Sequence, residues 1–358
     1  MGYHSMVAED WVPAALGWPD CTGFARPSAK HVMYPFQQLY NQDNATKTRE
    51  TFKSICRETY EDIASYWDQF MKTYKNESQF VFLWNVNLAH NRIDGLYHAD
   101  EPYYRLLESH EKRLENAFVF ILGDHGLRHG KVRKTKKGEL EDFNPFLMVS
   151  VPDQYRDSPI MNVLRKNSRN LISHYDTYAS LIHLSKMIKG DTLKEEFENP
   201  SQEPFKAGHG SSYFRVNMNQ PRHCSDLRIP YEYCLCDKSL EKPIAANSTT
   251  AKLLADSIVA SMQAKIDELK MTHLCSPRTV KYASTVAAKL VSEDKRKIYK
   301  VQITTNPGGG VFSGFVEIRD GTALPISNRF SRENTYGKQG DCVVNIEELR
   351  PYCYCKNS

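Results

Sequence analysis

An aspartate and a histidine stand side by side at Asp124 and His125, directly after an apolar segment. That segment, Phe118 to Leu122, is of the kind expected in a parallel strand covered on both faces. Glycines 123 and 126 allow a tight turn, so that the carboxylate and the imidazole can converge on one ion. The pair suits zinc, manganese or calcium at a hydrolytic centre. The alternative is a helix-capping and turn pair.

Three further polar residues, His90, Asp94 and His98, follow the apolar segment Phe80 to Val86. If this strand shares a parallel sheet with the strand before Asp124, both loops leave the same carboxyl edge. The sequence therefore predicts Asp94 and His98 as additional metal ligands and gives His90 a role in the site. Solvated loop residues are the alternative.

His209 is a candidate late ligand, because the glycines on both sides of it indicate a flexible turn. The alternative is an exposed histidine without a role.

A basic run comes directly after the Asp-His turn. It consists of Arg128, His129, Lys131, Arg133, Lys134, Lys136 and Lys137. Charge runs are usually solvated loops. Its position beside a metal-ligand pair nevertheless favours an anionic substrate. The acidic residues Glu139, Glu141 and Asp142 follow and could neutralise the run.

The elements that must position these residues alternate between strand-like and helix-like patterns. The strands are predicted at Tyr3 to Ala8, Phe80 to Val86, Phe118 to Leu122 and Pro145 to Val151. The helices are predicted around Phe52 to Tyr74, Asp100 to Leu114 and His174 to Ile188. Such alternation predicts an α/β fold with a mostly parallel sheet flanked by helices.

The pattern changes after Cys236. A linker over Lys242 to Thr250 precedes an amphipathic helix from Leu254 to Leu269, and two alternating strands then flank Asn306 to Gly310. We interpret the glycines as a hairpin turn, because a phosphate-binding loop would need a following helix and a Lys-Ser/Thr pair. The sequence thus predicts a first domain over residues 1–240 and a small α+β disulfide-containing module over 241–358.

Composition bounds the function classes. With 358 residues and 41% apolar content, the chain can bury a large core. The net charge of +4, from 47 basic and 43 acidic residues, gives no sign of nucleic-acid binding. No apolar run approaches the roughly 20 residues that cross a bilayer. The first ten residues lack the pattern of a signal peptide.

The nine cysteines include two clusters, Cys224, Cys234 and Cys236, and Cys342, Cys353 and Cys355. Each cluster ends in a Cys-x-Cys pair, a spacing that suits disulfides to two different partners better than a structural zinc site. Asn44, Asn76 and Asn247 begin glycosylation sequons. Together these features favour an extracellular or secretory glycoprotein. We expect Cys56, on the apolar face of a helix, to remain a buried thiol.

Residues 2 to about 238 resemble the sulfatase-like protein family of unknown function DUF229 of nematodes and insects, within the alkaline phosphatase superfamily. The matching segments are GYHSMVAED, FLWNVNLAHNRIDGLYHADEPYY, FVFILGDHG, SHYDTYASLIHL and IPYEYCLC. The ending RPYCYC looks like the additional module of these proteins.

This resemblance implies an alkaline-phosphatase/sulfatase-like sandwich that hydrolyses sulfate or phosphate esters at one or two divalent metal ions, zinc or calcium. Asp124 and His125 match the ligand pair of the superfamily, and His90 falls where a histidine contacts the substrate. The superfamily's first metal-binding Asp and its nucleophile belong to an N-terminal part that we expect to be missing here. Cys-x-Pro-Ser-Arg, the motif of authentic sulfatases, is absent as well. Without a nucleophile no covalent intermediate can form.

Three hypotheses follow from the sequence. The chain is an N-terminally truncated hydrolase, a secreted pseudoenzyme or binding protein of the same fold, or an unrelated disulfide-containing domain. We expect residues 1–358 by themselves to be inactive toward esters.

Overall fold

The computed structural model describes residues 2–11, 24, 26–34, 57–90, 93–128, 130–133, 135–218, 222–224, 226–230, 233–235, 240–290, 296–327, 329–335 and 337–356. Two compact units divide the chain, Met1–Met218 and Asn219–Ser358. The residues expected to form the α+β module, 241–358, fall wholly inside the second unit.

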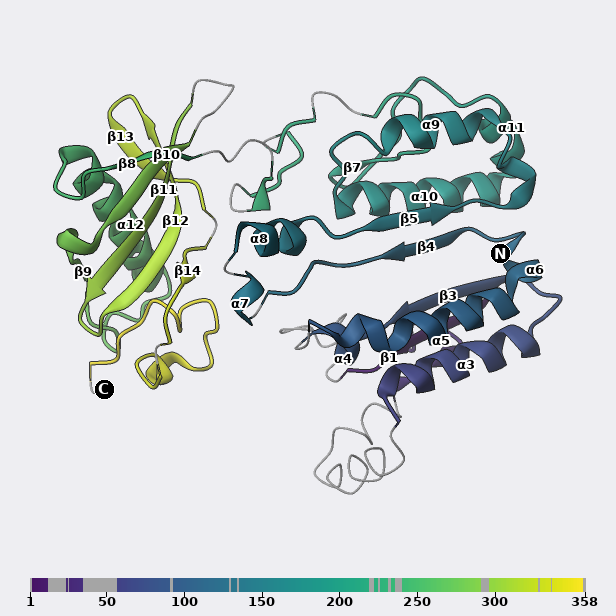
Figure 1. The fold of residues 1–358 in the computed structure, drawn as a ribbon, viewed down its shortest axis with the longest axis horizontal. Helices are drawn as coiled ribbons and strands as arrows, with labels where there is room; N and C mark the ends of the chain where they lie inside the picture. The colour runs from purple at the N-terminus through teal and green to yellow at the C-terminus, as the bar shows by residue number, and fades with distance from the viewer. Residues whose placement is uncertain are drawn as a thin grey trace. The chain divides into compact units, whose positions relative to one another are not determined.

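A parallel sheet begins the first unit. It consists of β1 (His4–Glu9), β2 (His31–Val32) and β3 (Gln79–Trp84) in the order β2-β1-β3. Figure 1 labels β1 and β3 of this sheet. Alternate residues of β1, Met6 and Ala8, are buried on one face. They pack with side chains of α3 (Thr59–Thr73), including Ile63 and Phe70. Because β-strand side chains alternate, the intervening residues point to the opposite face.

The helices beside this sheet have clear local causes. A capping box between Glu58 and Glu61 starts α3. The short helices α4 (Val86–Ala89) and α6 (Glu111–Leu114) flank α5 (Gly95–Ser109). At Gly95 a Cβ atom would lie 1.7 Å from the Leu88 carbonyl oxygen, so the close approach of α4 and α5 requires glycine.

The second sheet of this unit corrects the expectation of one mostly parallel sheet. The strand β4 (Val119–Leu122) runs antiparallel to β5 (Leu147–Ser150), and among the described residues these two form a sheet of their own (Figure 1). An apolar run signals a buried strand but says nothing of its direction. The helical segment between the two strands returns the chain beside β4. The mixture of helices and a small parallel sheet still agrees with the predicted α/β class.

Helices cover one face of the β4-β5 pair. These are η2 (Asp153–Tyr155), α9 (Pro159–Asn167), α10 (His174–Gly190) and α11 (Leu193–Glu198). Phe118, directly before β4, contacts the buried Phe197 and Phe214, and Phe120 and Val149 of the sheet pack against the same core cluster. A capping box between Ser173 and Asp176 fixes the start of α10. The two-residue strands β6 (Lys206–Ala207) and β7 (Gly210–Ser211) pair beside this helix.

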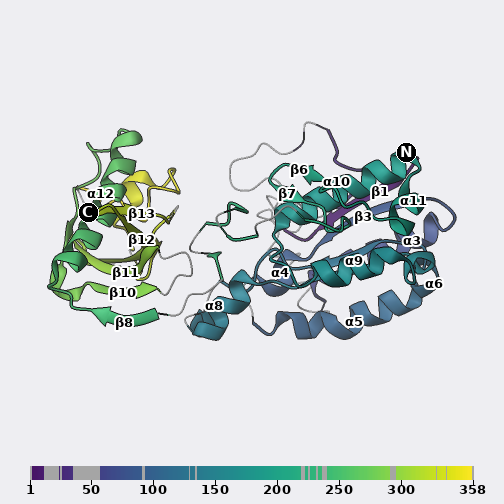
Figure 2. The ribbon, with the colours of Figure 1, turned by 90° about the horizontal axis from the view of Figure 1, so that it is seen from above.

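The second unit is built on an antiparallel sheet. Its main strands are β8 (Leu240–Ile244), β10 (Val286–Leu290), β11 (Lys297–Asn306), β12 (Gly310–Arg319) and β13 (Thr322–Pro325), adjacent in this order (Figure 2). Three small elements, β9 (Thr279–Val280), η4 (Tyr282–Ser284) and β14 (Ser331–Arg332), flank them. The hairpin predicted at Asn306 to Gly310 is confirmed, because Thr305 pairs with Gly310 and glycines 308 and 309 have positive φ angles.

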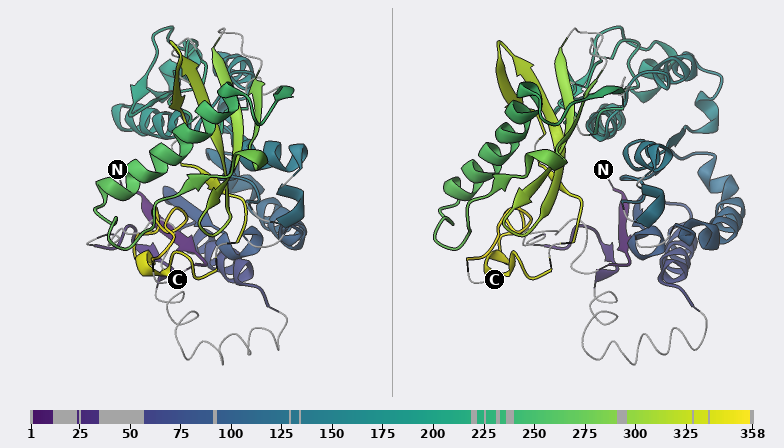
Figure 3. Two further views of the ribbon diagram at one scale, coloured as in Figure 1. Left: turned by 90° about the vertical axis from the view of Figure 1, so that its left-hand side faces the viewer. Right: turned by 60° about the vertical axis from the view of Figure 1, so that its left-hand side comes forward.

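A long helix, α12 (Thr249–Glu268), lies along one face of this sheet (Figure 3). Its fully buried residues Leu254 and Ile258 pack against Val301, Ile303 and Phe312 of the sheet. The 3₁₀ turn η5 (Asp341–Val343) belongs to a smaller cluster around Leu349.

Among the described cysteines of the second unit there are three disulfides: Cys224–Cys234, Cys275–Cys353 and Cys342–Cys355. The prediction that Cys353 and Cys355 bond to different partners is confirmed. The predictions for Cys56 and Cys236, and for the sequon at Asn44, lie outside the described residues. Asn76 and Asn247 are exposed, as glycosylation would require. In the described parts of the chain, every helix is too short or too polar to cross a membrane.

Candidate functional site

Asp124 and His125 lie where β4 ends, as predicted. The Asp124 side chain is about half exposed, at 54%, and the His125 Nε2 atom lies 3.6 Å from Asp124 Oδ2. The other ring nitrogen of His125, Nδ1, lies 2.7 Å from the Gly126 carbonyl oxygen, to which it can donate. This hydrogen bond leaves the lone pair of Nε2 free to face an ion together with the carboxylate.

The turn that holds the pair is fixed by hydrogen bonds to a neighbouring segment. The Gly123 amide donates to the Phe146 carbonyl at 3.2 Å, and the Gly126 amide donates to the Asp142 carbonyl at 2.9 Å. A Cβ atom on Gly126 would lie 2.1 Å from the Glu141 carbonyl oxygen. Gly126 is therefore required for close approach of another segment, and not only for a tight turn.

The basic run after the turn is largely helical. It includes α7 (Gly130–Arg133), and its end enters α8 (Lys136–Phe143). Arg133 pairs with the buried carboxylate of Asp142 at 2.5 Å and lies over the Phe143 ring. The acidic residues thus neutralise part of the run. Its remaining described cations, Arg128, Lys131, Lys136 and Lys137, are exposed.

The structure adds His174, which sequence reasoning missed. It is the first residue of α10, and its Nε2 atom lies 2.7 Å from the Asp124 carbonyl oxygen. The hydrogen bond ties the start of this helix to the Asp-His turn. The only signal in the sequence was a histidine at a well-capped helix start, which does not reveal a partner 50 residues away.

His209 comes near the same helix start. Its ring meets the Tyr175 ring edge-on, with the ring centroids 5.2 Å apart. A Cβ atom on Gly210 would lie 1.8 Å from the Tyr175 carbonyl oxygen, so the glycine lets this turn approach the first residues of α10. Two contacts therefore lead from the Asp-His turn to His209: the hydrogen bond between Asp124 and His174, and the ring contact between Tyr175 and His209. Among the hydrogen bonds of the described residues, none joins His209 directly to Asp124 or His125.

The three candidate site residues that follow β3 lie at different places in the helices α4 and α5. His90 is the C-cap of α4, and Asp94 is the N-cap of α5. His98 lies inside α5, and its Nδ1 atom is 2.9 Å from Glu58 Oε2. That hydrogen bond connects α5 with the residue that caps α3 and gives His98 a structural role. Metal or substrate contacts of these three residues stay predictions.

Within the described part of the chain, Asp124 and His125 are not joined by further side chains into a complete metal-binding set. Among the described residues, the only group of three or more potential Asp, Glu, His or Cys ligand atoms within 4.8 Å of one another is Cys342, Cys353 and Cys355. The Asp-His pair therefore gains no third ligand of these types from the described residues.

Asp10 is a second residue that sequence reasoning missed. It directly follows β1 and is buried. Its carboxylate accepts hydrogen bonds from the Thr59 hydroxyl at 2.7 Å and from the Val86 and Asn87 amides at 2.7 and 3.1 Å. Burial raises the pKa of Asp10 in spite of these bonds. The carboxylate connects β1, α3 and α4, and an acid at a strand end was its signal.

A buried serine, histidine and glutamate resemble the order of a hydrolase triad. The Ser212 hydroxyl lies 3.0 Å from His183 Nδ1, and His183 Nε2 lies 4.0 Å from Glu196 Oε2. However, Ser212 is 0% and His183 2% exposed, so no substrate reaches them. Burial lowers the pKa of His183 to about 4, and the neutral ring stacks on Phe205. We assign this group to packing.

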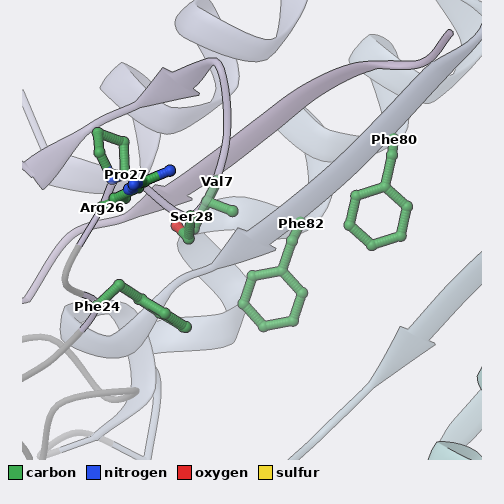
Figure 4. Close-up of a pocket in the computed structure, with 7 residues that line it drawn as sticks. All are labelled: Val7, Phe24, Arg26, Pro27, Ser28, Phe80 and Phe82. Atoms are coloured by element: carbon green, nitrogen blue, oxygen red, sulfur yellow. The ribbon is translucent and has the colours of Figure 1, made fainter.

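A shallow apolar pocket of about 590 Å³ lies on the second face of the parallel sheet (Figure 4). Its walls include Val7, Phe24, Phe80 and Phe82, with Arg26 at its edge. Phe80 is 55% exposed. Parallel sheets are usually covered on both faces. The pocket contains none of the predicted site residues.

The chain matches the model of one known protein family. The family described as "Protein of unknown function (DUF229)" matches residues 1–284. The chain belongs to this family. Neither the curated proteins nor the solved structures contain a match to it.

Proposed function

We propose that this DUF229 member carries part of a divalent-cation site of the sulfatase and alkaline phosphatase type, and that residues 1–358 bind an anionic ester without hydrolysing it. The observation that carries the proposal is the Asp124–His125 pair, in which a carboxylate oxygen and a ring nitrogen lie 3.6 Å apart. Two ligands at about 2.0 Å from a tetrahedral zinc ion are about 3.3 Å apart. A small rotation of either side chain would bring the pair onto one ion.

The surroundings support an ion at this place. The hydrogen bond from His125 Nδ1 to Gly126 sets the ring so that Nε2 faces the carboxylate. The contact between His174 and the Asp124 carbonyl holds the turn against α10. A bound zinc or calcium ion would supply a Lewis acid for the ester oxygen. The exposed cations from Arg128 to Lys137 would attract a sulfate or phosphate ester.

The incomplete ligand set favours binding over catalysis. A catalytic zinc usually has three protein ligands and an open position. The described residues place two side chains together here, without a third Asp, Glu, His or Cys atom within 4.8 Å. Weak ion binding is the expected result. The disulfides are compatible with the second hypothesis, a secreted binding protein of hydrolase-like fold.

Calorimetric titration of the chain with Zn²⁺, Ca²⁺ and Mn²⁺ tests the site. We expect binding that Asp124→Ala and His125→Ala each weaken at least about tenfold, because each removes one of two ligands. Asp153→Ala is the matched control, since Asp153 is an exposed acid that forms an ion pair with its neighbour Arg156. Equal binding by all three variants would contradict the site.

Nitrophenyl sulfate and nitrophenyl phosphate test the second part of the proposal. We expect no hydrolysis above that of Asp124→Ala at any metal concentration. Metal-dependent turnover that disappears in Asp124→Ala would keep the site and overturn the non-catalytic assignment.

A further inference from the structure

Four cysteines converge in the second unit from three separate segments. Cys275 follows α12, Cys342 lies in η5, and Cys353 and Cys355 lie near the C-terminus. The two disulfides that they form touch, because Cys342 Sγ lies 3.6 Å from Cys353 Sγ. Cys275 and Cys355 also face each other in an isolated antiparallel bridge. The sulfurs of Cys342, Cys353 and Cys355 all lie within 4.8 Å of one another, and the Cys275 sulfur joins this group through its bond to Cys353.

Contacts that do not involve sulfur hold these segments together. The Ser276 amide donates to the Tyr354 carbonyl at 2.7 Å, the Cys355 amide to Gln339 at 2.8 Å, and the Lys356 amide to Leu274 at 2.9 Å. A small apolar core of Ile266, Val343 and Leu349 packs beneath the cysteines. The four sulfur positions thus do not depend on the disulfides alone.

The surroundings favour negative charge on sulfur. The Cys342 amide donates to Cys355 Sγ at 3.1 Å. The buried Arg278 guanidinium donates to the Cys353 and Tyr352 carbonyl oxygens, at 3.2 and 2.6 Å. Its other hydrogen bonds within the described residues go to the Thr305 hydroxyl and the Pro307 carbonyl, and none goes to a carboxylate. A buried cation without an anionic partner is costly.

We propose that Cys275, Cys342, Cys353 and Cys355, once reduced, form a tetrathiolate site for Zn²⁺. In a tetrahedral site with Zn–S bonds of about 2.3 Å the sulfurs are about 3.8 Å apart. The Cys342–Cys353 separation of 3.6 Å already has nearly this value, and each bonded pair needs to open by less than about 2 Å. Cys275, which lies outside the group of three sulfurs within 4.8 Å, must in addition turn toward Cys342 and Cys355 once its bond to Cys353 is reduced. The resulting centre has a net charge of −2, which compensates Arg278.

A dithiol such as dithiothreitol is the reductant. Two dithiol molecules transfer four electrons and four protons to the two disulfides and become cyclic disulfides themselves. Four protein thiols result. One Zn²⁺ ion then replaces their four protons and binds four thiolates. The short Cys-x-Cys spacing is no obstacle, because the other two ligands come from distant segments.

Metal binding by the reduced full chain tests the proposal. The protein is reduced with dithiothreitol without oxygen, freed of reductant, and mixed with Zn²⁺ or Co²⁺. We expect one zinc ion per chain and the visible absorption of tetrahedral cobalt thiolate. The double variant Cys342→Ser/Cys355→Ser should bind at least about 100-fold more weakly, because losing ligands costs more affinity than losing their supporting groups.

The matched control is Cys224→Ser/Cys234→Ser, which removes the other described disulfide of this unit. It should retain the full zinc content and cobalt spectrum. Circular dichroism of the reduced, zinc-loaded protein should show an intact sheet. Absence of zinc, a spectrum typical of oxygen and nitrogen ligands, equal loss of binding in the control, or a reduced chain that stays unfolded with zinc would each overturn the proposal.

Discussion

The two units differ in how completely they cover their sheets. In the second unit, α12 covers one face of the antiparallel sheet, and Ile298 and Phe315 are buried in a separate cluster. In the first unit, the β2-β1-β3 sheet and the β4-β5 sheet each have one face packed in an apolar core and exposed apolar side chains as well. Phe80 on the parallel sheet is 55% exposed, and Met148 on β5 is 57% exposed.

This difference matters because the two kinds of sheet have different requirements. Antiparallel sheets commonly leave one face to solvent, whereas parallel sheets are normally covered on both. Contiguous exposed apolar patches mark interaction sites or aggregation hazards. We therefore expect the second unit to be the more stable part of the chain.

The largest effect should come from removing the long-range cross-link of the second unit. Cys275→Ala/Cys353→Ala should cost about 4.5 kcal/mol of unfolding free energy, because the bond closes a loop of 78 residues. Cys224→Ala/Cys234→Ala should cost about 2.7 kcal/mol, since only 10 residues separate that pair. Urea denaturation measures both. Equal costs would show that loop closure does not determine the stability of this unit.

The next largest difference is expected between the stability costs of removing two phenylalanine rings, one from each unit. Phe312→Ala removes a fully buried ring and should cost about 3–5 kcal/mol. Phe80→Ala removes a half-exposed ring and should cost less than about 1 kcal/mol while improving solubility. The same denaturation curves check the costs, and light scattering checks solubility. A cost at Phe80 close to that at Phe312 would mean that the second face of the parallel sheet is covered.

Acid should destabilise the first unit by a smaller amount. The pKa of buried His183 is lowered from 6.5 to about 4, so between these values the unfolded chain binds more protons than the folded one. The stability from the neutral ring is complete above pH 6.5 and falls as the pH decreases toward 4, by up to about 3 kcal/mol. Denaturation at several pH values measures this loss.

His183→Gln is the control for the acid effect. Burial raises the pKa of Asp10, which acts in the opposite direction above its ordinary value of 3.8, so the histidine contribution must be isolated. The variant should remove the loss of stability that the original chain shows as the pH decreases from 6.5 to 4, and leave the opposite contribution of Asp10. An unchanged slope would assign the effect to other groups.

The local pattern of apolar and polar residues was sufficient to predict the position of most helices and strands. The predicted strand at 118–122 is β4 at Val119–Leu122, and the helix predicted from His174 is α10. Alternation and the glycine turn located β11 and β12. Strand direction was not predictable, because the apolar run of β4 is the same whichever neighbour it pairs with.

The candidate site shows the same limit of prediction from local sequence pattern. Adjacent residues such as Asp124 and His125 could be predicted as a pair because no fold is needed to bring them together. His174 and Asp10 could not, since their contacts join segments 50 and 49 residues or more apart in the chain. Gly126 was recognised as a turn residue, but its close approach to Glu141 depends on the packing of α8.

Paramagnetic broadening by Mn²⁺ in nuclear magnetic resonance spectra tests most directly whether the Asp-His turn holds a cation. At substoichiometric Mn²⁺, we predict selective loss of the amide signals of Gly123 to Gly126 and of His174, with weaker broadening at His209. Asp124→Ala should restore these signals. Broadening centred elsewhere, or broadening at the turn that persists in Asp124→Ala, would contradict the account.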